Sequence, residues 1–246
     1  MRICVIAPPW VPVPPPRYGG TEAVLDTLVR GLQAAGHDVL LATTGDATSV
    51  VDTTWTFAES VGVGVGGSAA ELRHVLHAYE QARLWGADVI HDHTLVGPVY
   101  GGEGSIPVVT TNHGPFSAPD LGPLYRAIAP GVPVIAISHH HASSAVDTPI
   151  AAVIHHGLEV DQFAFGAGGE HAVFLGRMHP DKGVDAACRI ARAAGVPLVI
   201  AAKMSEAHEV ASSTTRSRRC SVATSSTSAR STCRRSPRCS GAPAAC

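Results

Sequence analysis

Short apolar runs alternate with stretches of helical periodicity over the first two hundred residues. Residues 2–7 are rich in apolar and β-branched side chains and predict a buried strand. A Pro-rich loop follows, and residues 21–36 then predict a helix that Thr21 caps and Gly36 ends. The apolar face of this helix is expected to consist of Ala23, Val24, Leu28, Leu32 and Ala35.

The same alternation continues through the first domain. Ser68 and Glu71 have the spacing of a capping box and predict a helix over residues 68–86. Residues 46–67 are interpreted as a mobile loop. Further strands are predicted at residues 39–42, 88–91, 108–110, 134–137 and 152–154. Strands separated by helices pair in parallel, so the pattern predicts an α/β domain with a doubly wound parallel sheet, which binds ligands at the carboxyl ends of its strands.

A second strand-helix-strand unit begins after a Gly-rich stretch without periodicity. We predict a complete Rossmann-like domain over residues 1–154, a linker over 155–170 and the start of a second Rossmann-like domain over 171–206. Its elements are predicted at residues 171–175, 183–194 and 197–201. Because this second domain is incomplete, we expect exposed apolar faces around Val173, Leu175, Val199 and Ile200.

The composition changes at residue 207. Residues 207–246 hold seven Arg, ten Ser and five Thr, with Glu209 as the one acidic residue. Such a segment has too little apolar surface to offset the entropy of ordering, so it predicts disorder. The whole chain has 18 basic and 20 acidic residues, which leaves 11 and 19 for residues 1–206 and 7 and 1 for the rest. The body therefore carries about −8 and the tail +6.

Two origins of the tail are compatible with its composition. Clustered Arg can bind nucleic acid through phosphates. Arg, Ser, Thr, Cys, Ala and Pro are also what G/C-rich coding DNA yields when it is translated out of frame. We favour the frameshift hypothesis, under which the chain is truncated after about residue 206 and does not bind nucleic acid.

The first 206 residues exclude several protein classes. Their apolar runs are shorter than the ~20 residues needed to span a bilayer, and the start of the chain lacks the length and cleavage site of a signal peptide. Only Cys4 and Cys188 occur there, without a CxxC pair. A cytoplasmic location is the expectation, with peripheral membrane contact left open.

The first candidate site is the segment Tyr18-Gly19-Gly20-Thr21-Glu22, at the junction of the Pro-rich loop and the first helix. Paired glycines let backbone amides approach a phosphate, and a helix start adds a favourable dipole. A plain turn before a helix has the same pattern, so this segment alone does not identify a phosphate site.

The second candidate site is the segment from Gly176 to Gly183, a predicted strand end, loop and helix start. It holds Arg177 and Lys182, five residues apart. A guanidinium fork and an ammonium group together suit a diphosphate. The alternative is a solvated capping loop.

Histidines cluster at the predicted strand ends, in His91-Asp92-His93, Asn112-His113-Gly114 and residues 139–141 and 155–156. Imidazole is a common zinc ligand, but these spacings form no metal-site motif, and most of the histidines are expected at the surface or in hydrogen bonds. His113 directly follows a strand and precedes a glycine, which places it at the edge of a cleft.

Together these segments resemble the retaining glycosyltransferases of family 4, which have the two-domain GT-B fold. The resemblance covers residues 1–206, in the family's order. Its motifs are residues 19–22, 88–93, 111–114, 136–138, 156–163 and 174–183.

The resemblance implies roles for individual residues. Gly19 and Gly20 would lie beside the donor diphosphate or the acceptor, and Arg177 with Lys182 would neutralise the departing diphosphate. His113 would approach the transferred sugar as the catalytic residue. The chain has no Asp-x-Asp motif, so the resemblance implies a nucleotide-sugar donor without a metal or other cofactor. Further residues expected in the cleft or at the acceptor are Tyr18, Glu22, His93, Asn112 and Ser138.

The chain also departs from the family pattern. The family's second domain carries two Glu eight positions apart near Pro-Phe-Gly, which bind the donor, and no such motif follows residue 183. We therefore expect this chain to have no transferase turnover. A non-catalytic binding domain and a GT-B sugar-nucleotide epimerase remain alternatives. Neither the nucleotide, the sugar nor the acceptor, whether sugar, lipid or small molecule, follows from the sequence.

Overall fold

The computed structural model describes residues 1–62, 68–102, 104–178, 180–203, 222–225 and 228–232. The chain divides into two units, Met1–Phe163 and the part from Ala164 onward. Each unit has its own sheet and is described by itself.

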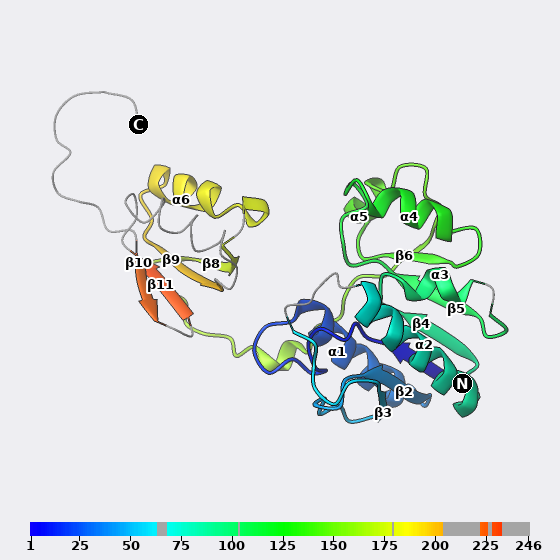
Figure 1. Ribbon diagram of the computed structural model, residues 1–246. Coiled ribbons are helices and arrows are strands. Elements are labelled where there is room, and N and C mark those ends of the chain that lie inside the picture. The colour runs from blue at the N-terminus through cyan, green and yellow to red at the C-terminus, as the bar shows by residue number, and fades with distance from the viewer. Residues whose placement is uncertain (63–67, 103, 179, 204–221, 226–227, 233–246) are drawn as a thin grey trace, which may run out of the picture. The chain divides into compact units, whose positions relative to one another are not determined.

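Unit 1 is built on a parallel sheet of seven strands in the order β3-β2-β1-β4-β5-β6-β7 (Figure 1). The order reverses direction between β1 and β4, which is the arrangement of a doubly wound fold. The strands are β1 (Arg2–Ile6), β2 (Asp38–Thr43), β3 (Asp52–Trp55), β4 (Val89–Asp92), β5 (Val108–Thr111), β6 (Val134–Ala136) and β7 (Ile150–Val153). All but β3 lie where the sequence predicts strands.

Helices cover both faces of this sheet. On one face, α2 (Ser68–Trp85) and α4 (Leu121–Ile128) contribute to a core with Cys4, Ile6 and Ile90. Two short helices, α3 (Gly97–Gly101) and α5 (His139–Ser143), accompany them. On the other face, α1 (Gly20–Ala34) packs on β1 and β2. Residues that alternate along one strand therefore belong to two different cores.

The orientation of α1 differs from the prediction. Leu25 and Val29 are fully buried and contact Val5 and Leu41 in the core, whereas Ala23 and Ala35 are exposed. Val24, Leu28 and Leu32 are partly buried, and Leu28 and Leu32 pack against this core as predicted. The sequence did not identify Leu25 and Val29 as the centre of the buried face, because α1 has apolar residues on more than one side. Thr21 does not cap α1, since the N-cap is Gly19 and no side chain caps the helix.

Strand β3 corrects the prediction of a mobile loop over residues 46–67. Asp52–Trp55 pairs in parallel with β2, from Leu40 opposite Asp52 to Thr43 opposite Trp55. Its sequence DTTW has no apolar run, and its side chains are mostly exposed. An edge strand is held chiefly by backbone hydrogen bonds, so its sequence carried little signal. Residues 63–67 of the predicted loop lie outside the described residues.

Unit 2 begins as predicted with β8 (Ala172–Arg177), α6 (Val184–Ala193) and β9 (Leu198–Lys203). β8 and β9 are parallel, and α6 covers one face of the pair. Val173 and Leu175 are exposed, as expected, but Ile200 is 4% exposed in the core beneath α6. The prediction for Ile200 was wrong because it treated neighbouring residues of one strand as sharing a face.

Two short strands fall inside the segment for which the sequence predicts disorder. β10 (Val222–Ser225) and β11 (Ser228–Thr232) are antiparallel, and β11 pairs with β9. An open strand edge offers backbone partners to Ser- and Thr-rich sequence that has no core of its own. The rest of residues 207–246 lies outside the described residues.

Truncating two valines on α1 tests its orientation. Val29→Ala removes fully buried methyl groups and is expected to lower the free energy of unfolding by roughly 2 kcal/mol. Val24→Ala makes the same chemical change at a partly buried position and should cost less than about 1 kcal/mol. Urea denaturation measures both. If Val24→Ala lowers the free energy of unfolding more than Val29→Ala does, the apolar face predicted from the sequence is the buried one.

Candidate active site

Four histidines from distant parts of the chain form a row at the carboxyl ends of the strands in unit 1. His91 and His93 come from β4 and the residue just after it, His113 follows β5, and His156 follows β7. Consecutive ring centroids are 4.1 Å apart for His91 and His93, and 5.2 Å for each of the next two pairs. We call these four residues the histidine row.

Hydrogen bonds fix the inner part of the row. The Nδ1 atom of His93 lies 2.9 Å from Nε2 of His113, and Nε2 of His91 lies 2.8 Å from Oγ1 of Thr111. His93 is 7% exposed, whereas His113 is partly buried and His156 is exposed. Exposure therefore increases along the row from His93 through His113 to His156, while His91 is partly buried.

The row is held in its neutral form. Burial lowers the pKa of both His91 and His113 to about 4, and it lowers the pKa of His93 well below its ordinary value. Each imidazolium would also repel its neighbours, which lowers the pKa of His93 and His113 further. Near neutral pH these side chains offer hydrogen bonds without carrying charge.

The turn after β4 is fixed by a buried carboxylate. Oδ1 of Asp92 accepts hydrogen bonds from the backbone N–H and the hydroxyl of Thr94, both at 2.7 Å. The Tyr79 hydroxyl contacts Oδ2 at 2.8 Å. A side chain at Gly97 would collide with the Asp92 carboxylate and with Thr94. His93 lies between Asp92 and Thr94, so this network determines where His93 sits. Burial raises the pKa of Asp92 to about 6 against these hydrogen bonds.

The neighbouring strand ends hold two further residues predicted for the site. Asn112 is 2% exposed, and its Oδ1 accepts from the N–H of Gly114 at 2.8 Å, which shapes the turn beside His113. Ser138 caps α5, with its hydroxyl accepting from the N–H of His141 at 3.0 Å. Both side chains thus already have local structural partners.

The start of α1 brings the predicted glycines next to an acidic side chain. A Cβ atom at Gly19 would lie 2.6 Å from Oε2 of Glu22 and 2.8 Å from Pro15, so only glycine fits there. Glu22 is 7% exposed, and burial raises its pKa. Tyr18 is 46% exposed. An anion that bound the amides of this helix start would face the Glu22 carboxyl group.

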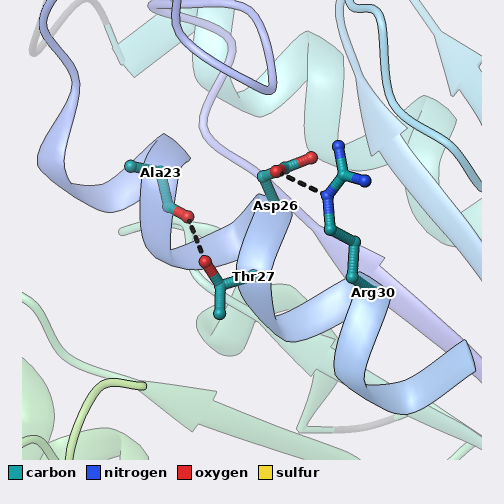
Figure 2. Close-up of polar contacts among 4 residues, drawn as sticks. All are labelled: Ala23, Asp26, Thr27 and Arg30. Atoms are coloured by element: carbon teal, nitrogen blue, oxygen red, sulfur yellow. Dashed lines mark hydrogen bonds and ion pairs between the residues drawn. The ribbon is translucent and has the colours of Figure 1, made fainter. Parts of the chain in front are cut away.

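A pocket of about 280 Å³ lies between α1 and strands β4 to β6. Its wall on α1 is mainly apolar, with Val24, Leu28 and Leu32, and His91 and His93 also line it. Thr27 belongs to this wall. Figure 2 shows its hydroxyl donating to the Ala23 carbonyl, at 3.1 Å, which leaves only lone pairs for a ligand. The partly buried face of α1 is therefore a pocket wall.

Unit 2 holds the two predicted cations. Arg177 is the last residue of β8, and Lys182 lies in the short 3-10 helix Pro180–Lys182 just before α6. Lys182 is exposed, and its Cβ would lie 3.8 Å from a Cβ at Gly176. The loop between the cations includes His179, which lies outside the described residues.

The described part of the chain contains neither a candidate metal centre nor a candidate membrane span. No group of three or more His, Cys, Asp or Glu residues there could hold a metal ion. None of its helices is long and apolar enough to cross a membrane.

Sequence reasoning missed several residues of this site. Tyr79 and His74 on α2 contact the carboxyl ends of β4 and β1, since Nε2 of His74 lies 2.9 Å from the carbonyl oxygen of Ala7. His91 and Asp92 were noted only as parts of a cluster. The alternation along β4, which puts His91 and Asp92 on opposite faces, could have separated their roles.

Comparisons with known proteins agree with this architecture. The family model described as Glycosyltransferase Family 4 matches residues 18–162. AviGT4, a glycosyltransferase involved in avilamycin A biosynthesis, has a TM-score of 0.60 and 22% identity, over 87% of this chain and 61% of AviGT4. Sucrose-phosphate synthase from Thermosynechococcus elongatus has a TM-score of 0.60 and 14% identity, over 81% of this chain and 61% of the synthase.

A third solved structure, the spinosyn rhamnosyltransferase SpnG complexed with thymidine diphosphate, has a TM-score of 0.51 and 20% identity, over 81% of this chain and 65% of SpnG. No curated protein matches the sequence. These similarities confirm the predicted α/β fold of GT-B type. The chain spans less than two thirds of the length of each of these three proteins.

The neutral histidine row predicts a pH dependence of stability. The pKa of His91 is about 4 in the folded chain and 6.5 ordinarily, so the unfolded chain binds an extra proton between these values. Stability is therefore lost as the pH falls from 6.5 toward 4, by roughly 3 kcal/mol for this group. His91→Gln should remove that part of the pH dependence.

The measured quantity is the difference between the free energies of unfolding at pH 7 and at pH 4.5, each obtained by urea denaturation. An effect of the substitution that is the same at both pH values cancels in this difference. His140→Gln, at an exposed histidine, is the control and should leave the difference between the two pH values unchanged. If His91→Gln shows the same pH difference as the unsubstituted chain, His91 is not held neutral by burial.

Proposed function

The chain belongs to Glycosyltransferase Family 4, because the family model matches residues 18–162 of its 246, and we propose that it acts in glycosyl transfer from a nucleoside-diphosphate sugar to an acceptor hydroxyl, with retention. The bond between the anomeric carbon and the diphosphate breaks, and its electron pair leaves with the phosphate. The acceptor oxygen then bonds to the same carbon on the same face, and the proton of the acceptor hydroxyl passes to a phosphate oxygen of the departing diphosphate.

The observation that carries this proposal is the position of His113. It follows the end of β5, where doubly wound sheets bind ligands, and it is partly buried, between the buried His93 and the exposed His156. A neutral imidazole there can hold a sugar hydroxyl without adding charge to a centre that becomes oxocarbenium-like. In this proposal His113 is the catalytic residue.

The proposed role of unit 2 is to stabilise the leaving group. Glycosyl transfer from a nucleotide sugar develops charge on the departing diphosphate, and fixed cations aimed at that charge are a strong catalytic device. Arg177 and Lys182 occur within one strand-loop-helix connection and supply two positive charges. We propose that they perform this role without a metal ion. SpnG, one of the similar structures, was solved with thymidine diphosphate, which supports a nucleotide ligand.

Residues of unit 1 are proposed for the acceptor side and, at the start of α1, for the donor diphosphate. The apolar wall of the α1 pocket and the partly buried His113 belong to the same strand-end region, through the shared residue His93. Gly19 and Gly20 offer backbone amides to the donor diphosphate. The buried carboxyl group of Glu22 beside them favours a hydroxyl-bearing ligand as well, since a carboxylate accepts hydrogen bonds from hydroxyls.

Turnover by this chain alone is a separate question from family membership. The chain spans less than two thirds of the length of each of the three similar solved structures, so turnover by these residues alone is itself a proposal. We propose that the chain binds nucleotide without completing transfer, as a non-catalytic binding domain would. A cytoplasmic location remains part of the proposal.

Calorimetric titration with nucleoside diphosphates tests the donor site. Uridine, guanosine, adenosine and thymidine diphosphates are titrated into the chain, and at least one is expected to bind. Arg177→Ala and Lys182→Ala should each weaken that binding about tenfold, since each removes a charge-assisted contact. Arg189→Ala, at an exposed residue of α6, is the control and should bind normally.

A matched turnover assay distinguishes binding from catalysis. Each nucleotide sugar is incubated with the chain and a mixture of sugar and alcohol acceptors, and released nucleoside diphosphate is measured. Binding without release supports the proposal for this chain. Release with transfer would contradict the proposal that this chain binds without turnover, whereas absence of binding to every nucleotide would contradict the proposed donor site.

A further inference from the structure

The contact between His93 and His113 contains information about where their protons lie. Nδ1 of His93 and Nε2 of His113 are 2.9 Å apart, which is the distance of a hydrogen bond. In a pair of neutral imidazoles one of these nitrogens must carry the proton and the other must accept it. Both residues are held neutral by burial, so two arrangements are possible.

The surroundings of His93 choose between the two arrangements. Its other nitrogen, Nε2, is buried and has no hydrogen-bond partner among the described residues. If that nitrogen carried the proton, a buried N–H group would be left without an acceptor, which native structures rarely tolerate. A proton on Nδ1 leaves only a lone pair at Nε2. Nδ1 of His93 therefore donates to Nε2 of His113.

We infer that His93 is a positioning residue that fixes the tautomer of His113, so that His113 presents an N–H group, at Nδ1, to the ligand. This inference rests on the proposed function for its meaning in catalysis. Because the His113 Nε2 lone pair is engaged by His93, it is not available as a base. Nδ1 of His113 has no hydrogen bond within the described part of unit 1, which leaves its N–H for a sugar hydroxyl or a phosphate oxygen.

The turn that carries His93 makes this arrangement rigid. The residues on either side, Asp92 and Thr94, are joined by two hydrogen bonds of 2.7 Å and are 0% and 2% exposed. Tyr79 attaches the same carboxylate to α2. Rotation of the His93 ring is further restricted by His91, whose ring centroid lies 4.1 Å away. Because the His93 ring is held in one orientation, its hydrogen bond to Nε2 of His113 is held as well.

Nitrogen NMR of the histidine rings tests the inference directly on the ligand-free chain at pH 7. In both His93 and His113 the Nδ1 atom is expected to be protonated and the Nε2 atom unprotonated, and Nε2 of His113 is expected to accept the hydrogen bond from Nδ1 of His93. Assignment comes from the loss of signals in single substitutions. A His113 protonated on Nε2 would overturn the inference, whatever the outcome of any nucleotide or transfer assay.

Two substitutions of His93 that are nearly isosteric with each other give a second test, which does not depend on the wild-type spectrum. His93→Asn places an amide N–H close to the position of Nδ1 and should keep the His113 tautomer. His93→Asp places an acceptor there, so His113 should switch to the Nε2–H tautomer and its pKa should rise. The exposed His140→Gln is the control and should change neither. Unchanged His113 signals in His93→Asp would contradict the inference.

A binding measurement then separates positioning from plain structural support. Binding of the nucleoside diphosphate identified by the calorimetric titration should fall about tenfold in His93→Asp and clearly less in His93→Asn, which keeps an N–H donor toward His113. Thermal unfolding of both variants shows whether they fold. If His93→Asp does not fold, the inference is tested by the wild-type spectrum and by the His93→Asn variant. If a folded His93→Asn loses as much binding as His93→Asp, the Nδ1 donor of His93 does not have the proposed role.

Discussion

Parallel pairing of β4 with its neighbours is the constraint on which the site depends. β1 pairs with β4 from Ile3 opposite Val89 to Ile6 opposite Asp92, and β4 pairs with β5 from Ile90 opposite Val108 to Asp92 opposite Thr110. In parallel strands the carboxyl ends meet at one edge, so residues some twenty positions apart in sequence become neighbours. His93 reaches His113 because both follow the ends of adjacent strands.

The alternation along β4 divides its end into one side that packs in a rigid polar network and another side that lines the pocket. Asp92 joins the polar network with Tyr79 and Thr94, next to the core formed with α2. His91 and His93 line the pocket on the side of α1. The buried carboxylate holds the turn, and the neutral imidazoles beyond it offer hydrogen bonds in a region of low dielectric, where such bonds are strong and an unpaired group is costly. The same burial that makes the row useful therefore also makes it sensitive to acid.

The two units contribute different chemistry. Unit 1 supplies neutral donors, an apolar pocket wall and a buried carboxyl group, whereas the predicted cations lie on unit 2. Under the proposed function, this separation would suit a reaction in which the sugar and the diphosphate need different surroundings. A hydroxyl-bearing substrate is held by hydrogen bonds, and a departing anion is held by positive charge. Membership of Glycosyltransferase Family 4 and the GT-B type of fold agree with that division.

The sequence by itself determined the fold class, six of the seven strands of unit 1, the position of His113 after a strand, and the family. Each of these depends on periodicity or on short contiguous motifs, which local sequence records. The sequence failed where position depends on backbone pairing, as in β3, and where a helix has apolar residues on several sides, as in α1. At these positions the type of side chain does not determine whether the residue pairs in a sheet or is buried.

Only the tertiary structure decided which histidines act together. His91, His93, His113 and His156 belong to three separate segments, and their contacts arise from strand order and register. Nothing local in the sequence of Asp92 or Tyr79 indicates that they fix the turn next to His93, since the carboxylate and the phenol meet only after α2 packs on β4. Residue types set the chemistry that is possible, and long-range backbone pairing and burial selected which of it is assembled.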